Sequence, residues 1–277
     1  MPKKNKKTEY NVNWKEYAKV WAKYTPPARP AKSDIAVIEK HIKSFFLKHK
    51  KLPVILILGI TPEFRDLCAK QKCHTVTVDS SRGMKKAMDL LISKKNKKES
   101  FVLSDWLSMD QKLPKEHFDL ILGDFVTNNI PYNKRTKFLN NINKLLTSEG
   151  YFISRDFVSL NKFKTLKQIM SRYLKMNKIN FTELWWDFLF HLTFDKKKRT
   201  IENHKISDIN FSILTDKEQK IIKKYFILFP PFKKTWTVPT RKQQDIEYRK
   251  IFTIEKVIYN NDYYLHEICP IYFLKKM

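Results

Sequence analysis

The apolar residues of this 277-residue chain follow a helical spacing near the N-terminus and form short continuous runs from residue 54 onward. From Trp14 to Tyr24 they recur every three or four positions, which predicts an amphipathic helix that ends at Pro26 and Pro27. Ser33 is predicted to cap a second helix. The later runs predict strands at residues 54–59, 75–79, 101–104, 118–123 and 151–157, with helices at 62–71, 82–93 and 133–146. Near-continuous apolar strands separated by helices predict a parallel sheet covered on both faces.

The alternation lapses after residue 158, and the segment that follows is aromatic-rich and mostly helical in its pattern. The chain closes with two β-like runs, at residues 251–259 and 268–274, joined by the hairpin signal Asn260-Asn261-Asp262. This organisation predicts an N-terminal basic tail with helices over residues 1–50. It predicts a second, larger domain over residues 51–277, with a helical insertion, or cap, at about 160–250.

Only four glycines occur in the chain, and each lies at or near the end of a predicted strand: Gly59, Gly83, Gly123 and Gly150. An average chain contains roughly 7% glycine. A coding bias against glycine would have removed it wherever it is dispensable. The four survivors are therefore expected where the backbone turns through φ > 0 or approaches a ligand closely.

The formal net charge is +27, which is typical of proteins that bind nucleic acids. The excess is spread along the chain, however, at +9, +6 and +12 for residues 1–50, 51–150 and 151–277, and it consists of 46 lysines against 9 arginines. Specific phosphate and base contacts favour arginine. We interpret the charge as a solvated lysine surface and keep nucleic acid as an alternative partner.

The sequence gives no sign of export or of a membrane. No apolar stretch is long enough to span a bilayer, and no apolar segment follows the basic N-terminus as a secretory signal would require. Cys68, Cys73 and Cys269 are an odd number without zinc-type spacing, so we expect reduced thiols, no metal site and a cytoplasmic location.

Acidic residues follow three of the predicted strands, at the edge where open α/β sheets bind ligands. Asp79 ends the second strand, where a carboxylate accepts hydrogen bonds from ribose hydroxyls. Asp105 ends the third beside Trp106, which together offer an acceptor for an amino group and an aromatic face. Asp124 ends the fourth, and Gly59 alone permits close backbone approach after the first. The set suits a ligand with a sugar, an adenine and a cationic centre, and it would repel a polyphosphate.

Five short segments, most of which include these strand-end residues, follow one another along the chain. They are Leu56-Ile57-Leu58-Gly59-Ile60-Thr61-Pro62-Glu63, Val78-Asp79-Ser80-Ser81 with Met84, Ser104-Asp105-Trp106-Leu107, Leu122-Gly123-Asp124 with Asn128-Asn129, and Leu145-Leu146-Thr147-Ser148-Glu149-Gly150-Tyr151. In order and spacing they resemble the class I S-adenosylmethionine-dependent methyltransferases, especially a bacterial branch that reads Leu-Gly-x-Thr-Pro-Glu in its first motif. The resemblance implies a Rossmann-like fold, with a mostly parallel seven-stranded sheet, a C-terminal antiparallel hairpin, N-terminal helices and a helical insertion before the last two strands.

The resemblance also implies roles for these residues in holding S-adenosylmethionine. Gly59 would let the backbone pass the methionine moiety, Asp79 would bind the ribose, and Asp105 would bind the adenine amino group with Trp106 beside the ring. Asp124 and Phe125 would lie near the sulfonium and the methyl acceptor. The same motifs place Thr61, Glu63, Ser80 and Met84 in the cofactor set. Glu63 either replaces the acidic residue that the first motif lacks or caps the following helix.

Methyl transfer from a sulfonium depends mainly on in-line placement of the acceptor and on exclusion of water. A general base is needed only for a protonated acceptor, and the candidates are Asp124, named here as the catalytic residue, His191 and Tyr132. The aromatic run at 181–194 is interpreted as the packed face of the cap, with a substrate-stacking wall as the alternative. The sequence predicts a methyltransferase that acts on a small molecule or a protein side chain. The alternatives are an RNA methyltransferase and a non-catalytic protein that binds a cofactor or nucleic acid.

Overall fold

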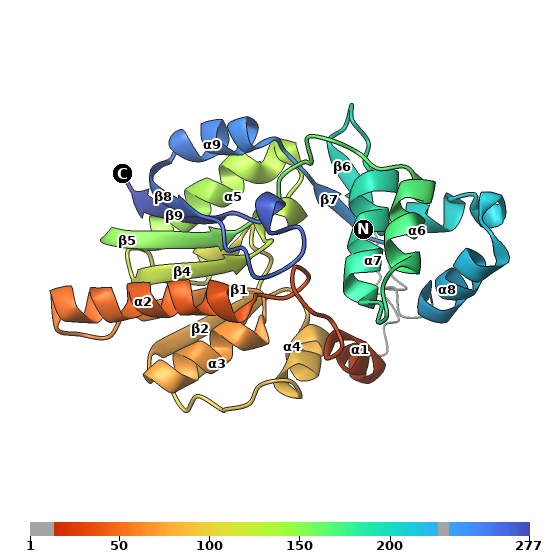
Figure 1. Ribbon diagram of the computed structural model, residues 1–277. Coiled ribbons are helices and arrows are strands. Elements are labelled where there is room, and N and C mark those ends of the chain that lie inside the picture. The colour runs from red at the N-terminus through yellow and green to blue at the C-terminus, as the bar shows by residue number, and fades with distance from the viewer. Residues whose placement is uncertain (1–13, 227–232) are drawn as a thin grey trace, which may run out of the picture.

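The computed structural model describes residues 14–226 and 233–277, and within them a central sheet carries the helices (Figure 1). The strands of this sheet are β1 (Val54–Leu58), β2 (His74–Asp79), β3 (Glu99–Leu103), β4 (Phe118–Asp124), β5 (Leu146–Arg155), β8 (Phe252–Ile258) and β9 (Ile271–Lys276). The helices of the sheet region are α1 (Trp14–Trp21), α2 (Lys32–His49), α3 (Pro62–Gln71), α4 (Arg82–Asp89), α5 (Tyr132–Leu145) and α9 (Arg241–Arg249).

The seven strands lie in the order β3-β2-β1-β4-β5-β9-β8. β1 to β5 are mutually parallel, whereas β9 runs antiparallel to both β5 and β8. This topology confirms the predicted mostly parallel sheet with a C-terminal antiparallel pair. Because β1 to β5 are parallel, their carboxyl ends meet at one edge of the sheet, and the cap stands beside this edge (Figure 1).

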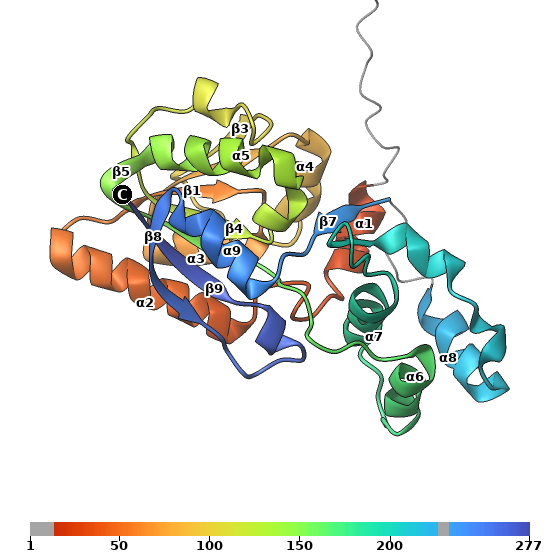
Figure 2. The same ribbon diagram turned by 90° about the horizontal axis from the view of Figure 1, so that it is seen from above.

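Both faces of the sheet are covered, as the apolar strands predict (Figure 2). On one face, Ile38 and Ile42 of α2 and Phe64 of α3 pack against strand residues such as Ile55 and Leu120. On the other face, a second core joins the opposite sides of the same strands to α5 and α9. Its largest members are Phe118, Phe138, Phe152, Tyr248, Phe252 and Tyr272.

The N-terminal boundary of α2 differs from the prediction. The helix begins at Lys32 with Ala31 as its N-cap residue, and the Ala31 N–H donates to Asp34 Oδ2 at 2.9 Å. Ser33 therefore caps nothing; its hydroxyl donates to Asp262 Oδ1 at 2.6 Å instead. A serine marks a helix start only when its side chain turns back to the backbone, and here a more distant acceptor takes its hydrogen bond.

The connection between the last two strands is also longer than the predicted hairpin. Residues 259–270 separate β8 from β9 and include a 3₁₀ turn, His266–Ile268. Asn260 lies in this long connection and not in a tight turn, and its side-chain amide donates to Asp34 Oδ1 at 2.6 Å. The loop is thus fastened to the start of α2. The predicted helix at 82–93 is shorter as well, since α4 ends at Asp89.

The four glycines differ in what the fold requires of them. Gly59 alone has a positive φ, at 85°. Gly123 is required for packing, since a Cβ there would lie 2.4 Å from Val126 Cγ2. A Cβ on Gly150 would lie 2.9 Å from the carbonyl oxygen of Thr147. Gly83 lies in the first turn of α4, so the expectation of a special backbone conformation or a ligand at every glycine was wrong.

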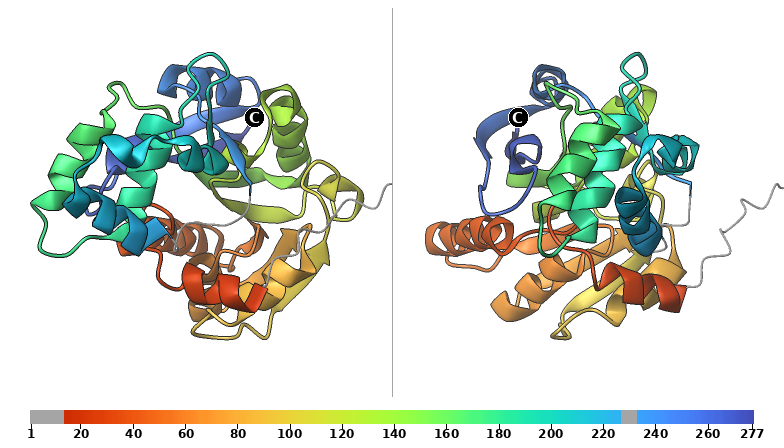
Figure 3. Two further views of the ribbon diagram at one scale, coloured as in Figure 1. Left: turned by 90° about the vertical axis from the view of Figure 1, so that its right-hand side faces the viewer. Right: turned by 45° about the vertical axis from the view of Figure 1, so that its right-hand side comes forward.

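The cap lies between β5 and α9 in the sequence and beside the sheet in space (Figure 3). It contains α6 (Leu166–Leu174), α7 (Phe181–Asp187), α8 (Asp216–Phe226) and a two-stranded antiparallel sheet, β6 (Thr200–Glu202) with β7 (Thr235–Thr237), which the sequence did not predict. Its short elements are the π-helical turn Phe188–Leu192 and the 3₁₀ turns Asn203–Asp208 and Phe211–Ile213. No helix within residues 14–226 and 233–277 is long and apolar enough to cross a membrane.

Candidate active site

The first strand ends against the indole of Trp106. The Gly59 N–H and the Trp106 Nε1–H both donate to the carbonyl oxygen of Val78, at 2.8 and 3.0 Å. A Cβ on Gly59 would lie 3.6 Å from Trp106 Cζ2, so the indole faces bare backbone. One carbonyl of β2 therefore holds the first loop and the aromatic side chain together. The φ of 85° at Gly59 is a conformation that favours glycine.

Asp79 lies at the end of β2 and is held by its own turn. Its Oδ1 accepts the Ser81 N–H at 2.7 Å, and Ser81 Oγ in turn caps α4 by accepting the Met84 N–H at 3.1 Å. Burial raises the pKa of Asp79 to about 6, while the backbone N–H groups of Ser81 and Ser80 and the charge of Lys234 oppose the rise. Asp79 is therefore a carboxylate at neutral pH, with a local geometry fixed before any ligand arrives.

Asp105 lies at the same edge, one strand away. β2 and β3 are adjacent and parallel, with Asp79 opposite Leu103, and the Ser104 N–H donates to the Asp79 carbonyl at 3.0 Å. Asp105 is exposed, and its Oδ1 accepts the Leu107 N–H at 2.9 Å. Both carboxylates thus lie at neighbouring strand ends, as the spacing predicted, and the structure shows that each also accepts an N–H from two residues further on.

Asp124, at the end of β4, is paired with a buried arginine. Its Oδ1 accepts from Arg155 Nε and Nη2, both at 2.8 Å, and Asp34 Oδ2 lies 3.5 Å from Nη1 of the same arginine. Burial raises the pKa of Asp124 to about 6; Arg155 lowers it, and Glu63 and Asp34 raise it. Asp124 is therefore ionised at neutral pH, and the adjacent guanidinium compensates its charge.

Phe125 follows in a strained backbone conformation. Its φ is 54°, a region that bulky residues rarely occupy. Its N–H donates to the Arg155 carbonyl at 2.7 Å, its carbonyl accepts from Asn129 at 2.8 Å, and the Arg155 guanidinium carbon lies 4.2 Å from its ring centroid. These contacts hold the ring against the aromatic side chains of the cap, 5.6 Å from Trp186.

Glu63, in the first turn of α3, meets an arginine of the preceding linker. Arg29 Nε donates to Glu63 Oε1 at 2.5 Å, and Glu63 Oε2 is buried with no partner among the residues that the structure describes. Thr61 is the N-cap residue of α3, but its side chain makes no capping hydrogen bond. Of the two roles considered for Glu63, helix capping is not the one that its side chain performs here.

Comparison with known proteins places this geometry in a family. A family model described as "Methyltransferase domain" matches residues 64–225, which is more than half of the chain. The chain belongs to this methyltransferase family. No curated protein matches the sequence.

Solved methyltransferases share the fold of this protein at low sequence identity. The CcbJ methyltransferase of Streptomyces caelestis has a TM-score of 0.58 at 11% identity, covering 96% of this chain and 98% of its own. The 1,6-didemethyltoxoflavin-N1-methyltransferase of Burkholderia thailandensis, with that compound and S-adenosylhomocysteine bound, has a TM-score of 0.51 at 13% identity, covering 95% and 89%. The N-methyltransferase NodS of Bradyrhizobium japonicum, with S-adenosylhomocysteine, has a TM-score of 0.50 at 10% identity, covering 96% and 99%.

The N-terminal helix of this methyltransferase packs on residues that follow β1 and on α4. Tyr17 and Ala18 of α1 are buried against Ile60, which follows β1, and against α4, where Met84 packs on the same cluster. The Arg29 guanidinium also lies 3.5 Å from the Trp21 carbonyl. The linker arginine therefore connects α1 to Glu63.

Two of the three candidate bases make hydrogen bonds to residues of the cap. Tyr132 donates its hydroxyl to the Arg199 carbonyl at 3.2 Å, and burial raises its pKa to about 12. His191 Nδ1 accepts the Lys164 N–H at 3.1 Å, and its Nε2 lies 3.4 Å from Asp187 Oδ1 within the cap. Both make contacts typical of structural residues. Only Asp124 joins Phe125 at the end of β4.

Sequence reasoning missed two basic residues near the site. Arg155, at the end of β5, carries no motif of its own, although it holds both Asp124 and Phe125. Lys234 precedes β7 of the cap; burial lowers its pKa, and the charge of Asp79 opposes that change. The scarcity of arginine was a signal for Arg155, because an arginine kept in so lysine-rich a chain is expected to have a specific partner.

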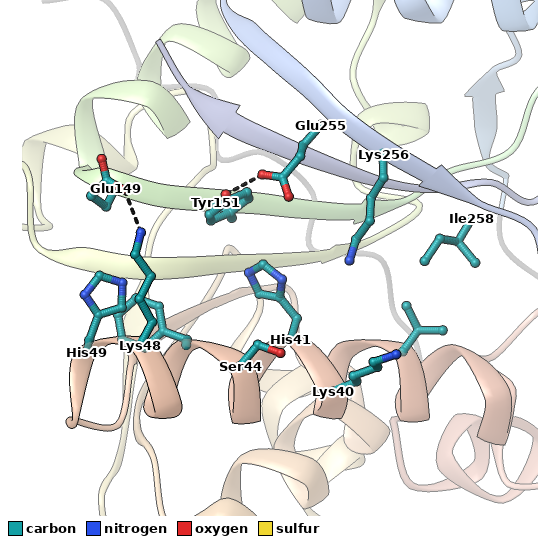
Figure 4. A pocket seen from close by; sticks show the side chains of 12 residues that line it. Lys40, His41, Ser44, Lys48, His49, Glu149, Tyr151, Glu255, Lys256 and Ile258 are labelled. Carbon is teal, nitrogen blue, oxygen red and sulfur yellow. Dashed lines mark hydrogen bonds and ion pairs between the residues drawn. The ribbon is translucent and has the colours of Figure 1, made fainter.

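A groove of about 450 Å³ lies elsewhere, on the α2 face of the sheet (Figure 4). There Lys48 lies 3.2 Å from Glu149, and Tyr151 hydrogen-bonds Glu255. Burial and the nearby Lys256 lower the pKa of His41 to about 4. None of the predicted site residues lines this groove, so it is separate from the strand ends.

Proposed function

We propose that S-adenosylmethionine binds along the carboxyl edge of the sheet and that a small molecule receives the methyl group. The observation that carries this proposal is the shared edge of Asp79, Asp105 and the Gly59–Trp106 contact. In this proposal Asp79 accepts hydrogen bonds from the ribose, Asp105 accepts from the adenine amino group, and Trp106 lies beside the ring. Ser80, Met84 and Thr61 complete the surroundings of the nucleoside.

The methionine end of the cofactor fits Glu63. Its Oε2 is a buried carboxylate oxygen with no partner among the described residues, and such an atom is destabilising unless a donor satisfies it. The ammonium group of the methionine moiety is a donor of the required charge. Arg29, which already holds Oε1, orients the carboxylate.

The chain contributes placement and charge to the reaction. S-adenosylmethionine supplies an electrophilic methyl group, to which the lone pair of the acceptor forms a bond while the electrons of the broken C–S bond return to sulfur. Phe125 would lie near that centre, with its ring held against the Arg155 guanidinium and Trp186 of the cap. Asp124 retains the catalytic role predicted for it, because it directly precedes Phe125 at the end of β4. Arg155 fixes its position.

A small-molecule acceptor is supported by the covered site. The aromatic side chains of the cap are buried where they meet Phe125, at 5% exposure for Trp185 and 4% for Trp186. A folded protein or a duplex would need an open approach to this edge. The N1-methyltransferase from Burkholderia thailandensis, whose fold this chain shares, was solved with a small heterocyclic compound. RNA remains the alternative acceptor that the lysine content raised.

The organisation of the chain follows the same proposal. The tail and helices of residues 1–50 precede a methyltransferase domain at 51–277, with the cap at about 160–250. The three cysteines are free and buried, which supports a reducing compartment such as the cytoplasm.

Calorimetric titration with three ligands tests the cofactor assignment. We expect S-adenosylhomocysteine and adenosine to bind and ATP not to bind, because Asp79 and Asp105 repel a polyphosphate. Glu63→Gln should weaken S-adenosylhomocysteine but leave adenosine unchanged, since adenosine lacks the methionine end. Tight ATP binding, or equal losses for both nucleosides, would contradict the assignment. Transfer of labelled methyl to bulk tRNA would favour the RNA alternative.

A further inference from the structure

Four aromatic side chains beside the end of β4 carry a buried polar atom without a hydrogen-bond partner among the described residues. The atoms are Trp21 Nε1, Tyr24 Oη, Trp185 Nε1 and Trp186 Nε1. Buried tyrosine hydroxyls and indole N–H groups normally find a partner, and an unpaired one is destabilising. Four of them at one place therefore require an explanation in function.

The four rings form one continuous cluster. Tyr24 stacks on Trp185, with centroids 5.5 Å apart and planes at 20°, and meets Trp21 edge-on at 5.5 Å. The centroids of Trp185 and Trp186 are 6.1 Å apart. Although α1 and α7 are far apart in the sequence, their unpaired groups thus belong to a single packed cluster.

Hydrogen bonds fix the linker after α1 onto the start of α7. The Thr25 N–H donates to Thr182 Oγ1 at 3.1 Å, and the Thr25 hydroxyl donates to Asn180 Oδ1 at 3.2 Å. Polar groups in this junction are therefore able to find partners, and the four ring atoms remain without one. Poor fit between the two segments does not explain them.

The cluster borders the place where the proposed function puts the methyl group, and the inference rests on that function. Trp186 lies 5.6 Å from Phe125 and 5.5 Å from Phe157 between ring centroids. Phe125 follows directly after Asp124 at the end of β4. An acceptor that meets the methyl group here would contact these rings.

The chemistry of the unpaired atoms selects the acceptor. An indole N–H only donates, so three of the four atoms require acceptor atoms on the ligand, and an ammonium offers none. The flat ring faces favour stacking with another flat ring. We propose that the acceptor is a small, flat aromatic molecule, neutral or anionic, whose carbonyl, phenolate or ring-nitrogen atoms accept hydrogen bonds from Tyr24, Trp185 and Trp186.

Calorimetry on the full chain saturated with S-adenosylhomocysteine tests the proposal with four probes. We expect 7-hydroxycoumarin and quinolin-4-ol to bind saturably, and cyclohexanol and spermidine not to bind. Tyr24→Phe and Trp185→Phe should each weaken binding of the aromatic probes about fivefold to tenfold, because each removes one donor. Trp236→Phe is the matched control, since Trp236 lies 6.4 Å from Trp185 and its indole nitrogen is not among the buried unpaired atoms.

The midpoint of urea unfolding of Tyr24→Phe distinguishes a hydroxyl that serves a ligand from one that stabilises the fold. If the hydroxyl serves a ligand, its removal leaves the unfolding midpoint unchanged or raises it; a lower midpoint would overturn the proposal. Spermidine binding, failure of both aromatic probes, or equal loss in Trp236→Phe would overturn it as well. If the unmodified protein does not bind S-adenosylhomocysteine at all, the proposed function is refuted instead. The two failures are therefore distinguishable.

Discussion

The carboxyl edge of the sheet and the aromatic cluster of the cap satisfy their polar groups in opposite ways. At the edge, Asp79 and Asp105 each accept a backbone N–H from two residues further on, and Trp106 donates to a strand carbonyl. In the cluster, Tyr24 and Trp185 are almost fully buried, yet their polar atoms have no partner in the part of the chain that the structure describes.

One buried carboxylate inside the cap is hydrogen-bonded, in contrast to the four ring atoms of the cluster. Asp187 there accepts hydrogen bonds from Tyr264 at 2.6 Å, Tyr173 at 2.7 Å and Arg172 at 3.1 Å. The cap thus pairs this carboxylate, although Thr200 Oγ1 and His204 Nδ1 elsewhere in it are buried with no hydrogen-bond partner among the described residues. The contrast teaches that a prearranged edge suits a cofactor that is always the same. Unpaired N–H and O–H donors suit a methyl-accepting substrate whose atoms supply the missing hydrogen-bond acceptors.

The largest expected effect is at the junction between the two regions. Arg155→Met would leave Asp124 and Asp34 buried without their shared cation, which should lower the free energy of unfolding by about 3–5 kcal/mol. Urea denaturation measures this. Arg82→Met, at an exposed position in α4, is the control and should stay within about 0.5 kcal/mol. Equal, small losses in both variants would show that the junction does not depend on Arg155.

A second change tests the packing beneath the edge. In Gly123→Ala, the new Cβ would lie 2.4 Å from Val126 Cγ2 and 3.2 Å from Phe152 Cε2, so we expect a loss of about 1–3 kcal/mol in unfolding free energy. Gly83→Ala, in the first turn of α4, should instead gain up to about 1 kcal/mol from helix propensity. Thermal melting of both variants compares them, and a neutral Gly123→Ala would contradict the packing argument.

A third pair of variants sharpens the contrast inside the cap. Tyr173→Phe removes a hydroxyl that donates to the buried Asp187, so it should cost about 1.5 kcal/mol of unfolding free energy. Tyr24→Phe removes an unpaired hydroxyl and should cost nothing. Urea midpoints of the two proteins decide the matter. If both fall by the same amount, the distinction between satisfied and unsatisfied aromatic groups is wrong.

The smallest effect is a pH dependence of cofactor binding. Hydrogen bonds from ribose favour the Asp79 carboxylate, and its pKa is raised to about 6. Binding therefore holds its full strength above that value and weakens as the pH falls through 6, by up to about tenfold per unit. Calorimetry with S-adenosylhomocysteine between pH 5 and 8 should show this slope, and Asp79→Asn should remove it. A slope that persists in Asp79→Asn would assign the titration to Asp124 or Asp156, whose pKa values are also raised to about 6.

The sequence predicted the sheet and its edge because their contacts are local. Apolar runs define strands, and a carboxylate that accepts from two residues ahead is part of its own turn. The contacts that join segments far apart in the sequence are different. Asn128 donates at 2.8 Å to the carbonyls of both Phe157 and Thr237, and buried Arg135 joins α5 to Glu247 in α9 at 2.7 Å. The contacts of Asn128 with Thr237 and of Arg135 with Glu247 connect residues over a hundred positions apart, and no local pattern encodes them.

The same limit explains the errors at Ser33 and at residues 260–262. Each has the composition of a cap or a turn, but its side chains bond to a segment more than two hundred positions away in the sequence. Arg155 and Lys234 were missed for this reason too. Their importance comes from Asp124 and Asp79, which the fold brings to them.

The central claim, a nucleoside held by strand-end carboxylates, is tested most directly by titrating three matched variants with S-adenosylhomocysteine. Asp195 is the control, because its Oδ1 accepts the Lys197 N–H at 2.9 Å in the same kind of turn, but within the cap. We predict that Asp79→Asn and Asp105→Asn weaken binding at least about tenfold, as loss of a hydrogen bond to a charged group implies, while Asp195→Asn leaves it unchanged. Equal affinities in all three variants would contradict the account.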